Sequence, residues 1–214
     1  FAATLTRNAL RGAPVEIVED LLRRGVPVRG ILINNAVANV GVATGKDDAR
    51  TVLARLAELA DAEDQFFAPA STGVIGWRLP TEPIIAILPD LVASASLGSI
   101  LPAARAIMTT DRYPKVRSRR VGSATVTGFA KGAGMIEPSM ATMLAFLMTD
   151  AVVDREILQK LLTQAVELSF NRISVDSDQS TSDMVLALSS QQVESVSQND
   201  LGEAIAEVCL DLAE

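Results

Sequence analysis

Apolar residues recur at helical spacing in several parts of this chain, with polar residues between them. The strongest pattern covers 47–62, where an acidic start suits the positive end of a helix dipole. We also predict a helix over 154–170, and an amphipathic one over 199–214 with Asn199 as N-cap. Weaker helical patterns cover 81–95 and 100–108.

Short apolar runs between these segments predict strands. The run RGILIN at 29–34 reads as a buried strand, followed by a loop of small residues at 36–45. The chain begins within what reads as a strand at Phe1. Alternating helices and strands, without repeats or a clear linker, predict a mixed α/β fold class. The remaining extended segments are expected at 66–70, 124–130, 143–148 and 184–189.

The composition limits the class of protein. Hydrophobic residues make up 49% of the chain but aromatic ones only 4%, so the core must be aliphatic. A net charge of −7 repels phosphate backbones and disfavours nucleic acid as a partner. One basic cluster is expected to form a solvated connection or a charged strand edge that discourages aggregation, with anion binding as the alternative. The cluster consists of Arg112, Lys115, Arg117, Arg119 and Arg120.

Two further features bear on chemistry and location. Cys209 is the only cysteine, and it falls within the apolar pattern of the last helix, which indicates a buried hydrophobe. The most apolar region, 84–104, contains Pro89, Asp90 and Pro102 and is not a membrane span. Without a signal peptide in view, we expect a cytoplasmic protein that does not bind membranes.

The chain contains no histidine. This excludes Ser–His–Asp and Cys–His catalysis within the chain and removes the commonest zinc ligand. The acidic series Asp176, Asp178 and Asp183 does not fit a calcium loop, because the central glycine and the terminal glutamate are absent. We expect no metal and no cofactor.

The segment KGAGMIEPSMATML, from Lys131 to Leu144, offers another way to activate a nucleophile. A threonine hydroxyl can attack the carbonyl before it, and hydrolysis of the resulting ester frees a new amino terminus. Thr142 would then carry its own base, an α-amine whose pKa is ordinarily about 7.7–8. Most Ala-Thr pairs beside a strand, however, serve only packing and β-propensity, and glycine-rich loops are weakly specific.

The same segment closely resembles the cleavage-site motif of the ornithine acetyltransferase (glutamate N-acetyltransferase) family, in which an Ala–Thr bond is cut. STGVIG at 71–76 is similar to the family's oxyanion-hole segment, and AARAIMTTD at 103–111 to its substrate-binding segment. SFNRISVDSDQSTSD at 169–183 resembles its loop in the second subunit. The resemblance implies an N-terminal-nucleophile-type layered fold, with sheets packed against helices.

The resemblance also implies roles for single residues. Thr142 is the acetylated nucleophile, exposed by cleavage of the Ala141–Thr142 bond, and Thr72 with Gly73 forms the oxyanion hole. Lys131 and Thr110 contact the amino-acid substrate. Each role has a plainer alternative: Thr72-Gly73 could form an ordinary turn, Lys131 could be a surface charge, and Thr110 could belong to a turn or cap. Thr109, adjacent to Thr110, is an alternative substrate contact.

In the family the chain is cut into two segments that form one interwoven fold. Here these are an α segment, 1–141, and a β segment, 142–214. The pattern departs from the family in the loop Asn35–Asn39 and at Ser177, where glycine is usual. The chain ends at Glu214, before a family segment that supplies a substrate-binding glutamate, so the β segment is expected to be incomplete.

The implied reaction is the transfer of an acetyl group from N-acetylornithine to glutamate in arginine biosynthesis. Acetyl-CoA stays open as a second donor, and the implied assembly is α2β2 or larger. The alternatives are an N-terminal-nucleophile amidohydrolase or aminopeptidase on the same scaffold, or an inactive truncated homologue. Release of ornithine without glutamate would indicate a hydrolase. An intact Ala141–Thr142 bond together with the absence of an acyl-enzyme would indicate an inactive chain.

Overall fold

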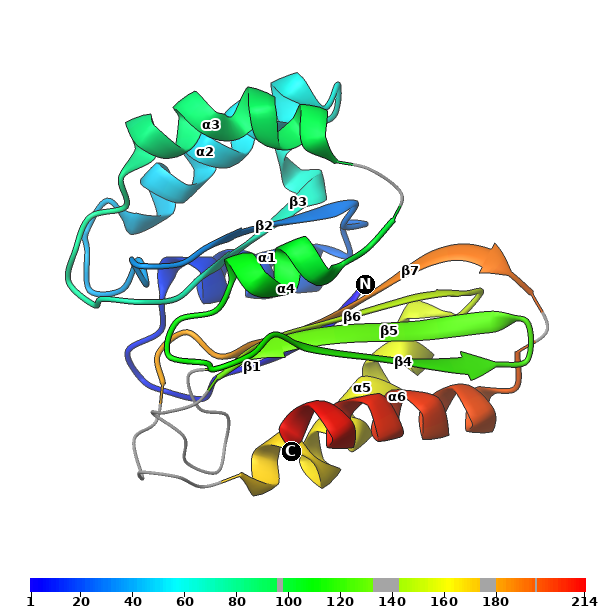
Figure 1. Ribbon diagram of the computed structural model, residues 1–214. Coiled ribbons are helices and arrows are strands. Elements are labelled where there is room, and N and C mark those ends of the chain that lie inside the picture. Colours follow the sequence, from blue (N-terminus) through cyan, green and yellow to red (C-terminus); the bar gives the residue numbers. More distant parts are fainter. Residues whose placement is uncertain (96–97, 133–142, 174–179, 195) are drawn as a thin grey trace. The chain divides into compact units, whose positions relative to one another are not determined.

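The computed structural model describes residues 1–95, 98–132, 143–173, 180–194 and 196–214. The chain divides into two compact units. The larger unit combines Phe1–Asn8 with Ile100–Glu214, and the smaller one spans Ala9–Ser99. Each unit combines helices with a sheet, which confirms the mixed α/β fold class (Figure 1).

A five-stranded sheet forms the larger unit, in the order β1-β7-β6-β5-β4. Strands β6 and β7 are parallel, and the other neighbouring pairs are antiparallel. The parallel pair requires a crossover connection, in which helix α5 (Arg155–Leu168) lies. Since β5 is antiparallel to β6, the last residues of β5 lie at the same end of the sheet as the first residues of β6 and β7. The strands are β1 (Ala2–Leu5), β4 (Lys115–Val121), β5 (Ala124–Lys131), β6 (Leu144–Ala151) and β7 (Met184–Val193).

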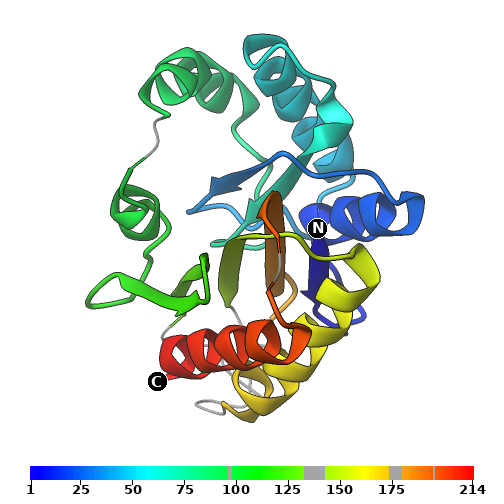
Figure 2. The ribbon, with the colours of Figure 1, turned by 90° about the vertical axis from the view of Figure 1, so that its right-hand side faces the viewer.

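The core of the larger unit lies between this sheet and two helices. Helices α5 and α6 (Gln198–Ala213) lie side by side on one face of the sheet, as Figure 2 shows. Leu147 of β6, Leu162 of α5 and Val208 of α6 are buried in one apolar cluster. Cys209 is buried there as well, and burial raises the pKa of its thiol to about 12, so the predicted hydrophobic role is confirmed.

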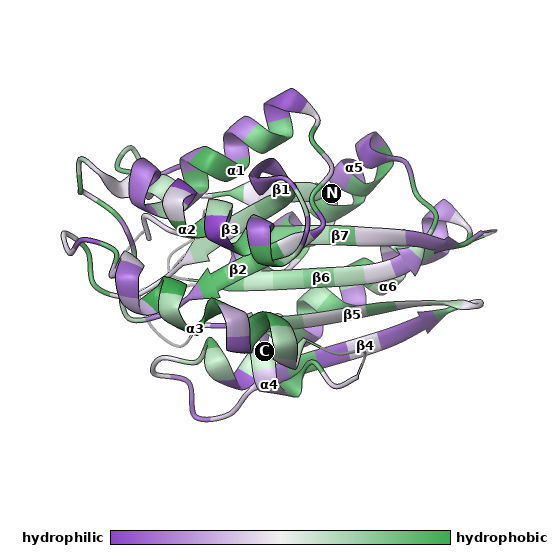
Figure 3. Cartoon of the chain, turned by 90° about the horizontal axis from the view of Figure 1, so that it is seen from above, coloured by the Kyte–Doolittle hydropathy of each residue, from purple (hydrophilic) through white to green (hydrophobic). Residues whose placement is uncertain are grey.

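Strand β4 contains most of the basic cluster and forms an edge of the sheet. In Figure 3 it is coloured largely hydrophilic, whereas β6 is hydrophobic along much of its length. Arg119 of β4 forms ion pairs with Glu207 and Asp211 of α6. The predicted charged strand edge is therefore confirmed for the part of the cluster that lies on β4. Helix α4 (Leu101–Ala106) and the short 3₁₀ turn η2 (Phe170–Arg172) complete this unit.

In the smaller unit, the described residues form two parallel strands and three α-helices. Strand β2 pairs with β3 in a register that places Asn34 opposite Ser71 at their ends. Helix α1 was not predicted, although Val15, Val18 and Leu21 give it a buried face. The elements are α1 (Ala13–Arg24), β2 (Gly30–Asn34), α2 (Gly45–Leu59), the 3₁₀ turn η1 (Asp64–Phe66), β3 (Phe67–Ser71) and α3 (Thr81–Ser94).

The predicted start of the last helix was wrong by two residues. Ser197, and not Asn199, is the N-cap of α6, because its hydroxyl accepts the N–H of Asp200 three residues on. This is the usual offset between a cap and the free N–H groups of the first turn. None of the helices in the described ranges is long and apolar enough to cross a bilayer.

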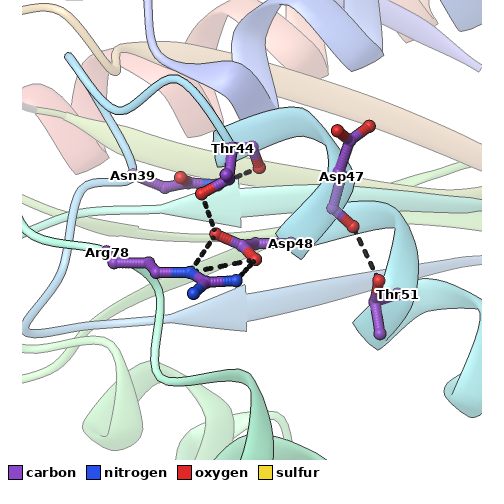
Figure 4. A network of polar contacts seen from close by, with 7 residues as sticks. Asn39, Thr44, Asp47, Asp48, Thr51 and Arg78 are labelled. Atoms are coloured by element: carbon purple, nitrogen blue, oxygen red, sulfur yellow. Dashed lines mark hydrogen bonds and ion pairs between the residues drawn. The ribbon is translucent and has the colours of Figure 1, made fainter.

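A polar network holds the start of α2 in the smaller unit (Figure 4). The buried carboxylate of Asp48 accepts hydrogen bonds from Arg78, whose Nε donates to Oδ2 at 3.0 Å and to Oδ1 at 3.3 Å and whose Nη2 donates to Oδ1 at 2.8 Å. The Thr44 hydroxyl donates another at 2.7 Å. The hydrogen bonds from Arg78, opposed by burial, hold the pKa of Asp48 below its ordinary value.

We therefore predict that Arg78→Gln lowers the melting temperature at neutral pH by on the order of 2–4 °C. The effect is modest because the Arg78 side chain is 67% exposed and screened by water. A carboxylate with a lowered folded pKa stabilises the fold above its unfolded pKa of about 4 and ceases to do so as the pH falls through the folded value. The difference from the parent should thus close below about pH 4 in thermal melts. Arg55→Gln, which removes an exposed pair with Glu58, is the matched control and should change little.

Candidate functional site

In the larger unit, the end of β5 lies beside the beginnings of β6 and β7. This arrangement brings together the predicted site residue Lys131 with Met143 and Asp183. Lys131 is the last residue of β5 and pairs with Leu144, the first of β6. Leu144 in turn pairs with Met184, the first residue of β7. Met143 and Asp183 precede those two strands and lie side by side. The predicted nucleophile Thr142 and Ala141 lie outside the described residues, directly before Met143.

Asp183 is fully buried at this end of the sheet. Its Oδ1 accepts the N–H of Met143 at 2.7 Å, and its carbonyl accepts the N–H of Thr6 at 3.0 Å. Its Oδ2 is buried without a hydrogen-bond partner among the described residues. Burial raises the pKa of this carboxyl to about 7, although the Met143 N–H, a hydrogen bond with the Ser180 side chain and the charge of Lys131 oppose the rise. Asp183 can therefore gain or lose a proton near neutral pH.

Lys131 is 2% exposed, which contradicts its reading as a surface charge. Its Nζ donates to the Thr109 hydroxyl at 3.3 Å. Burial lowers the pKa of Lys131, while the carboxylates of Asp111 and Asp183 raise it. An ammonium group has three donors, so this lysine can bind a further anionic group while it keeps the Thr109 contact.

Asp111 ties the loop before β4 to the end of β5. Its Oδ1 accepts the N–H of Gly132 at 2.9 Å, and its Oδ2 the N–H of Thr109 at 3.4 Å. The Lys115 ammonium donates to the carbonyl of Gly132 at 3.1 Å. These bonds place Thr109 beside Lys131, and both Thr109 and Thr110 are exposed on this turn. Of the two threonines, the one in contact with Lys131 is Thr109.

The predicted oxyanion-hole residues lie just after β3 in the smaller unit. The N–H of Thr72 donates to the carbonyl of Asn34 at 3.1 Å, and that of Val74 to the carbonyl of Ala36 at 2.9 Å. The Thr72 hydroxyl is buried without a hydrogen-bond partner in the described part of the chain. Gly73 has a φ of +130°, and a Cβ there would lie 2.2 Å from the Ala36 carbonyl carbon. This turn requires glycine and leaves one hydroxyl available as a donor.

The ArgJ family model matches residues 1–214 of this chain. The chain belongs to the ArgJ family. Two relatives are both described as arginine biosynthesis bifunctional protein ArgJ. The one from Syntrophotalea carbinolica is 41% identical over 223 residues, covering 99% of this chain and 56% of the relative. The one from Methylococcus capsulatus is 45% identical over 198 residues, covering 90% and 48%. The chain thus spans about half the length of the curated relatives it matches.

Two solved ArgJ-family structures share the fold. Ornithine acetyltransferase from Mycobacterium tuberculosis, solved with ornithine, matches with a TM-score of 0.55 and 28% identity, covering 66% of this chain and 77% of that chain. The ArgJ protein of Bacillus halodurans matches with a TM-score of 0.52 and 26% identity, covering 66% and 76%. These matches confirm the predicted fold, in which sheets pack against helices.

Asp183 and Asp111 are the residues of this ArgJ-family site that the sequence interpretation did not assign. Asp183 was noted in a rejected calcium pattern and as the last residue of the segment 169–183, and Asp111 as the last residue of the segment 103–111, but neither was given a role. One signal was present: Asp183 is a carboxylate directly before the apolar run MVLAL. An acidic residue directly before the buried start of a strand needs a hydrogen-bond partner, and here that partner is the N–H of Met143, directly before the neighbouring strand β6.

Proposed function

We propose that this chain carries the self-cleavage site, oxyanion hole and substrate lysine of an ornithine acetyltransferase. It transfers an acetyl group from N-acetylornithine to glutamate through an acetyl-Thr142 intermediate, after cleavage between Ala141 and Thr142. The observation that carries the proposal is a pair of buried charged groups: Asp183, which accepts the N–H of Met143, the residue after Thr142, and Lys131, whose charge interacts with Asp183. The ornithine bound by the Mycobacterium tuberculosis relative supports an amino-acid substrate.

The chemistry needs two half-reactions. The α-amine of Thr142 takes the proton of its own hydroxyl, and the Oγ attacks the acetyl carbon of N-acetylornithine. The Thr72 hydroxyl and the Gly73 N–H stabilise the oxyanion, and ornithine leaves with the proton. The amine of glutamate then attacks the acetyl-Thr142 ester, which gives N-acetylglutamate and restores the hydroxyl. Both half-reactions use the same groups of this chain.

Cleavage at residue 141 would leave the two segments joined by one sheet. Strands β1, β4 and β5 precede the cut, whereas β6 and β7 follow it and lie between β1 and β5. The segments 1–141 and 142–214 would therefore stay paired through backbone hydrogen bonds. The proposal includes an α2β2 or larger assembly of such segments in the cytoplasm, with acetyl-CoA as a donor still to be tested.

Within this proposal Lys131 binds the α-carboxylate that both amino-acid substrates share, with Thr110 as a further contact. We predict that Lys131→Met raises the KM for N-acetylornithine on the order of 50-fold, because a buried charge partner is lost. Burial lowers the pKa of Lys131, so the parent's KM should rise at a lower pH than an exposed lysine would give. The variant should lack that alkaline rise. Steady-state kinetics from pH 7 to 10 measure both effects, with Lys160→Met, an exposed lysine of α5, as the control.

The direct test follows ornithine release from N-acetylornithine with and without glutamate. Release that depends on glutamate, together with formation of N-acetylglutamate, supports the transferase. Equal release in the absence of glutamate would replace it with the amidohydrolase. An uncut chain that releases no ornithine and forms no acetyl-enzyme would contradict the proposal and indicate an inactive homologue.

A further inference from the structure

The buried ammonium group of Lys131 depends on its surroundings. Lys131 is 2% exposed, and its Nζ donates to the Thr109 hydroxyl at 3.3 Å. Burial lowers the pKa of Lys131, because it disfavours the charged form. A neutral amine attracts a carboxylate far less than an ammonium ion does. A lysine that binds a carboxylate from such a place needs a nearby group that fixes it and keeps it charged.

From the hydrogen bonds around this lysine, we propose that Asp111 is the positioning residue for Lys131. Its two carboxylate oxygens anchor the backbone on both sides of the ammonium group, and its negative charge attracts that group. This inference rests on the proposed function, since it requires Lys131 to bind the α-carboxylate of the amino-acid substrate. It gives Asp111 a task that acts through the lysine.

The end of β5 shows why an anchor is needed. Ala130 is the last residue of β5 that pairs with β4, and it lies opposite Lys115. Beyond it, side chains take the place of the neighbouring strand. Asp111 Oδ1 accepts the N–H of Gly132 at 2.9 Å, and the Lys115 ammonium donates to the carbonyl of Gly132 at 3.1 Å. The backbone that follows Lys131 is therefore fixed through both of its polar groups.

The second oxygen of Asp111 anchors the turn that contains Thr109. Oδ2 accepts the N–H of Thr109 at 3.4 Å, and the hydroxyl of the same threonine accepts from Lys131. One carboxylate thus connects the residue after Lys131 with the residue that the ammonium group contacts. Hydrogen bonds to an ionised acceptor are roughly twice as strong as neutral ones, so a neutral side chain would hold both segments less firmly.

Two carboxylates act on Lys131 among the described residues. Asp111 lies on the turn before β4, and Asp183 lies directly before β7. Both raise the pKa of Lys131 against the effect of burial, and the effect of Asp111 is the larger. The nearby cation of β4, Lys115, is directed at the carbonyl of Gly132. Asp111 therefore joins a geometric and an electrostatic action on the same ammonium group.

The test is a double-mutant cycle that measures the KM for N-acetylornithine. Asp111→Asn keeps the shape of the side chain and one acceptor oxygen but removes the charge, so KM should rise about 10-fold, with a smaller change in kcat. In a Lys131→Met background the same substitution should raise KM no further, because its effect acts through the lysine. A parental KM in Asp111→Asn, or an equal rise in both backgrounds, would overturn the inference.

Asp150→Asn is the matched control for the cycle. Asp150 is a partly buried carboxylate whose Oδ1 accepts the N–H of Thr125 at 2.7 Å in the same sheet. It lies near the end of β6 that is remote from Leu144, the partner of Lys131. Its KM should equal that of the parent. An increase as large as that of Asp111→Asn would count against the inference, since any lost carboxylate would then have the same effect.

The pH dependence of KM is a readout that a merely structural role would not move. In the parent, KM should rise at alkaline pH as Lys131 loses its proton. Without the charge of Asp111 the pKa of Lys131 falls further, so the rise in Asp111→Asn should begin at lower pH. Asp183, with a pKa of about 7, is ionised over this range in both chains, and the substrate's own amine titrates equally in both assays. A rise at the same pH in both chains would refute the role of Asp111.

Thr109→Val keeps the test decisive if thermal melts show that Asp111→Asn is unfolded. Valine keeps the backbone N–H that Asp111 anchors and removes only the hydroxyl that Lys131 contacts, at an exposed position. The KM should rise a few-fold in the parent background and not in the Lys131→Met background. A parental KM in Thr109→Val would show that the turn does not orient the lysine, and the inference would be wrong.

These outcomes separate the inference from the proposed function. A parent that transfers acetyl groups, with a raised KM in Lys131→Met and a parental KM in Asp111→Asn, would refute only the role of Asp111. An unchanged KM in Lys131→Met would refute the substrate role of Lys131 and the inference that depends on it. A parent that releases no ornithine would refute the proposed function itself.

Discussion

A chain in which Thr142 is replaced by alanine is expected to remain a single polypeptide and to form no acetyl-enzyme. Alanine has no hydroxyl, so neither the attack on the Ala141 carbonyl nor the attack on the acetyl donor has a nucleophile. The anchoring of the next residue is unaffected, because Met143 is held through its backbone N–H by Asp183 and through its carbonyl by the N–H of Met184.

Intact mass spectrometry of the parent and the Thr142→Ala chain measures this effect. The parent should give two fragments that split after Ala141, and the shorter one should gain an acetyl group on incubation with N-acetylornithine. Thr142→Ser keeps a hydroxyl and is the matched control, so it should be cut and acetylated, at a different rate. Cleavage of the alanine variant at the same bond would show that another group attacks, and the N-terminal-nucleophile proposal would be wrong.

Much of the fold could be predicted because its elements have a strong local signal. Helices α2, α5 and α6 repeat apolar residues at helical spacing, and β2, β5 and β6 are apolar runs between turns. Helix α1 has such a repeat too, but it is short and has Pro14 in its first turn, where proline is compatible with a helix although it resembles a breaker. Strand β4 has charged residues along most of its length, as an edge strand can.

The candidate site was less accessible to sequence interpretation. Thr72, Gly73, Lys131 and Thr142 came from a resemblance to a family, and spacing alone did not favour them over ordinary turns. The contact of Asp183 with Met143 joins residues 40 positions apart. It exists because β6 and β7 are adjacent parallel strands, and a local pattern contains no information on which strands become neighbours.

Replacing Gly73 with alanine is expected to lower the kcat for acetyl transfer by on the order of 100- to 1,000-fold, with a smaller change in KM. At a φ of +130° an added Cβ would lie 2.2 Å from the carbonyl carbon of Ala36 and 2.3 Å from its oxygen, so the backbone must move. That movement displaces the Gly73 N–H and the adjacent Thr72 hydroxyl, and the loss of one oxyanion donor has a cost of this size.

Gly76→Ala is the matched control for that experiment. Gly76 also has a positive φ, +82°, but nothing lies within 4 Å of the position of an added Cβ. The control therefore introduces a similar backbone strain without the clash, and its kcat should stay within a few-fold of the parent. Fixed-time assays of ornithine release give the kcat of each variant, and thermal melts of both variants show whether either is unfolded. Equal kcat values would show that the Thr72–Gly73 turn does not stabilise the oxyanion, because only a donor used in the transition state lowers kcat selectively when it is displaced.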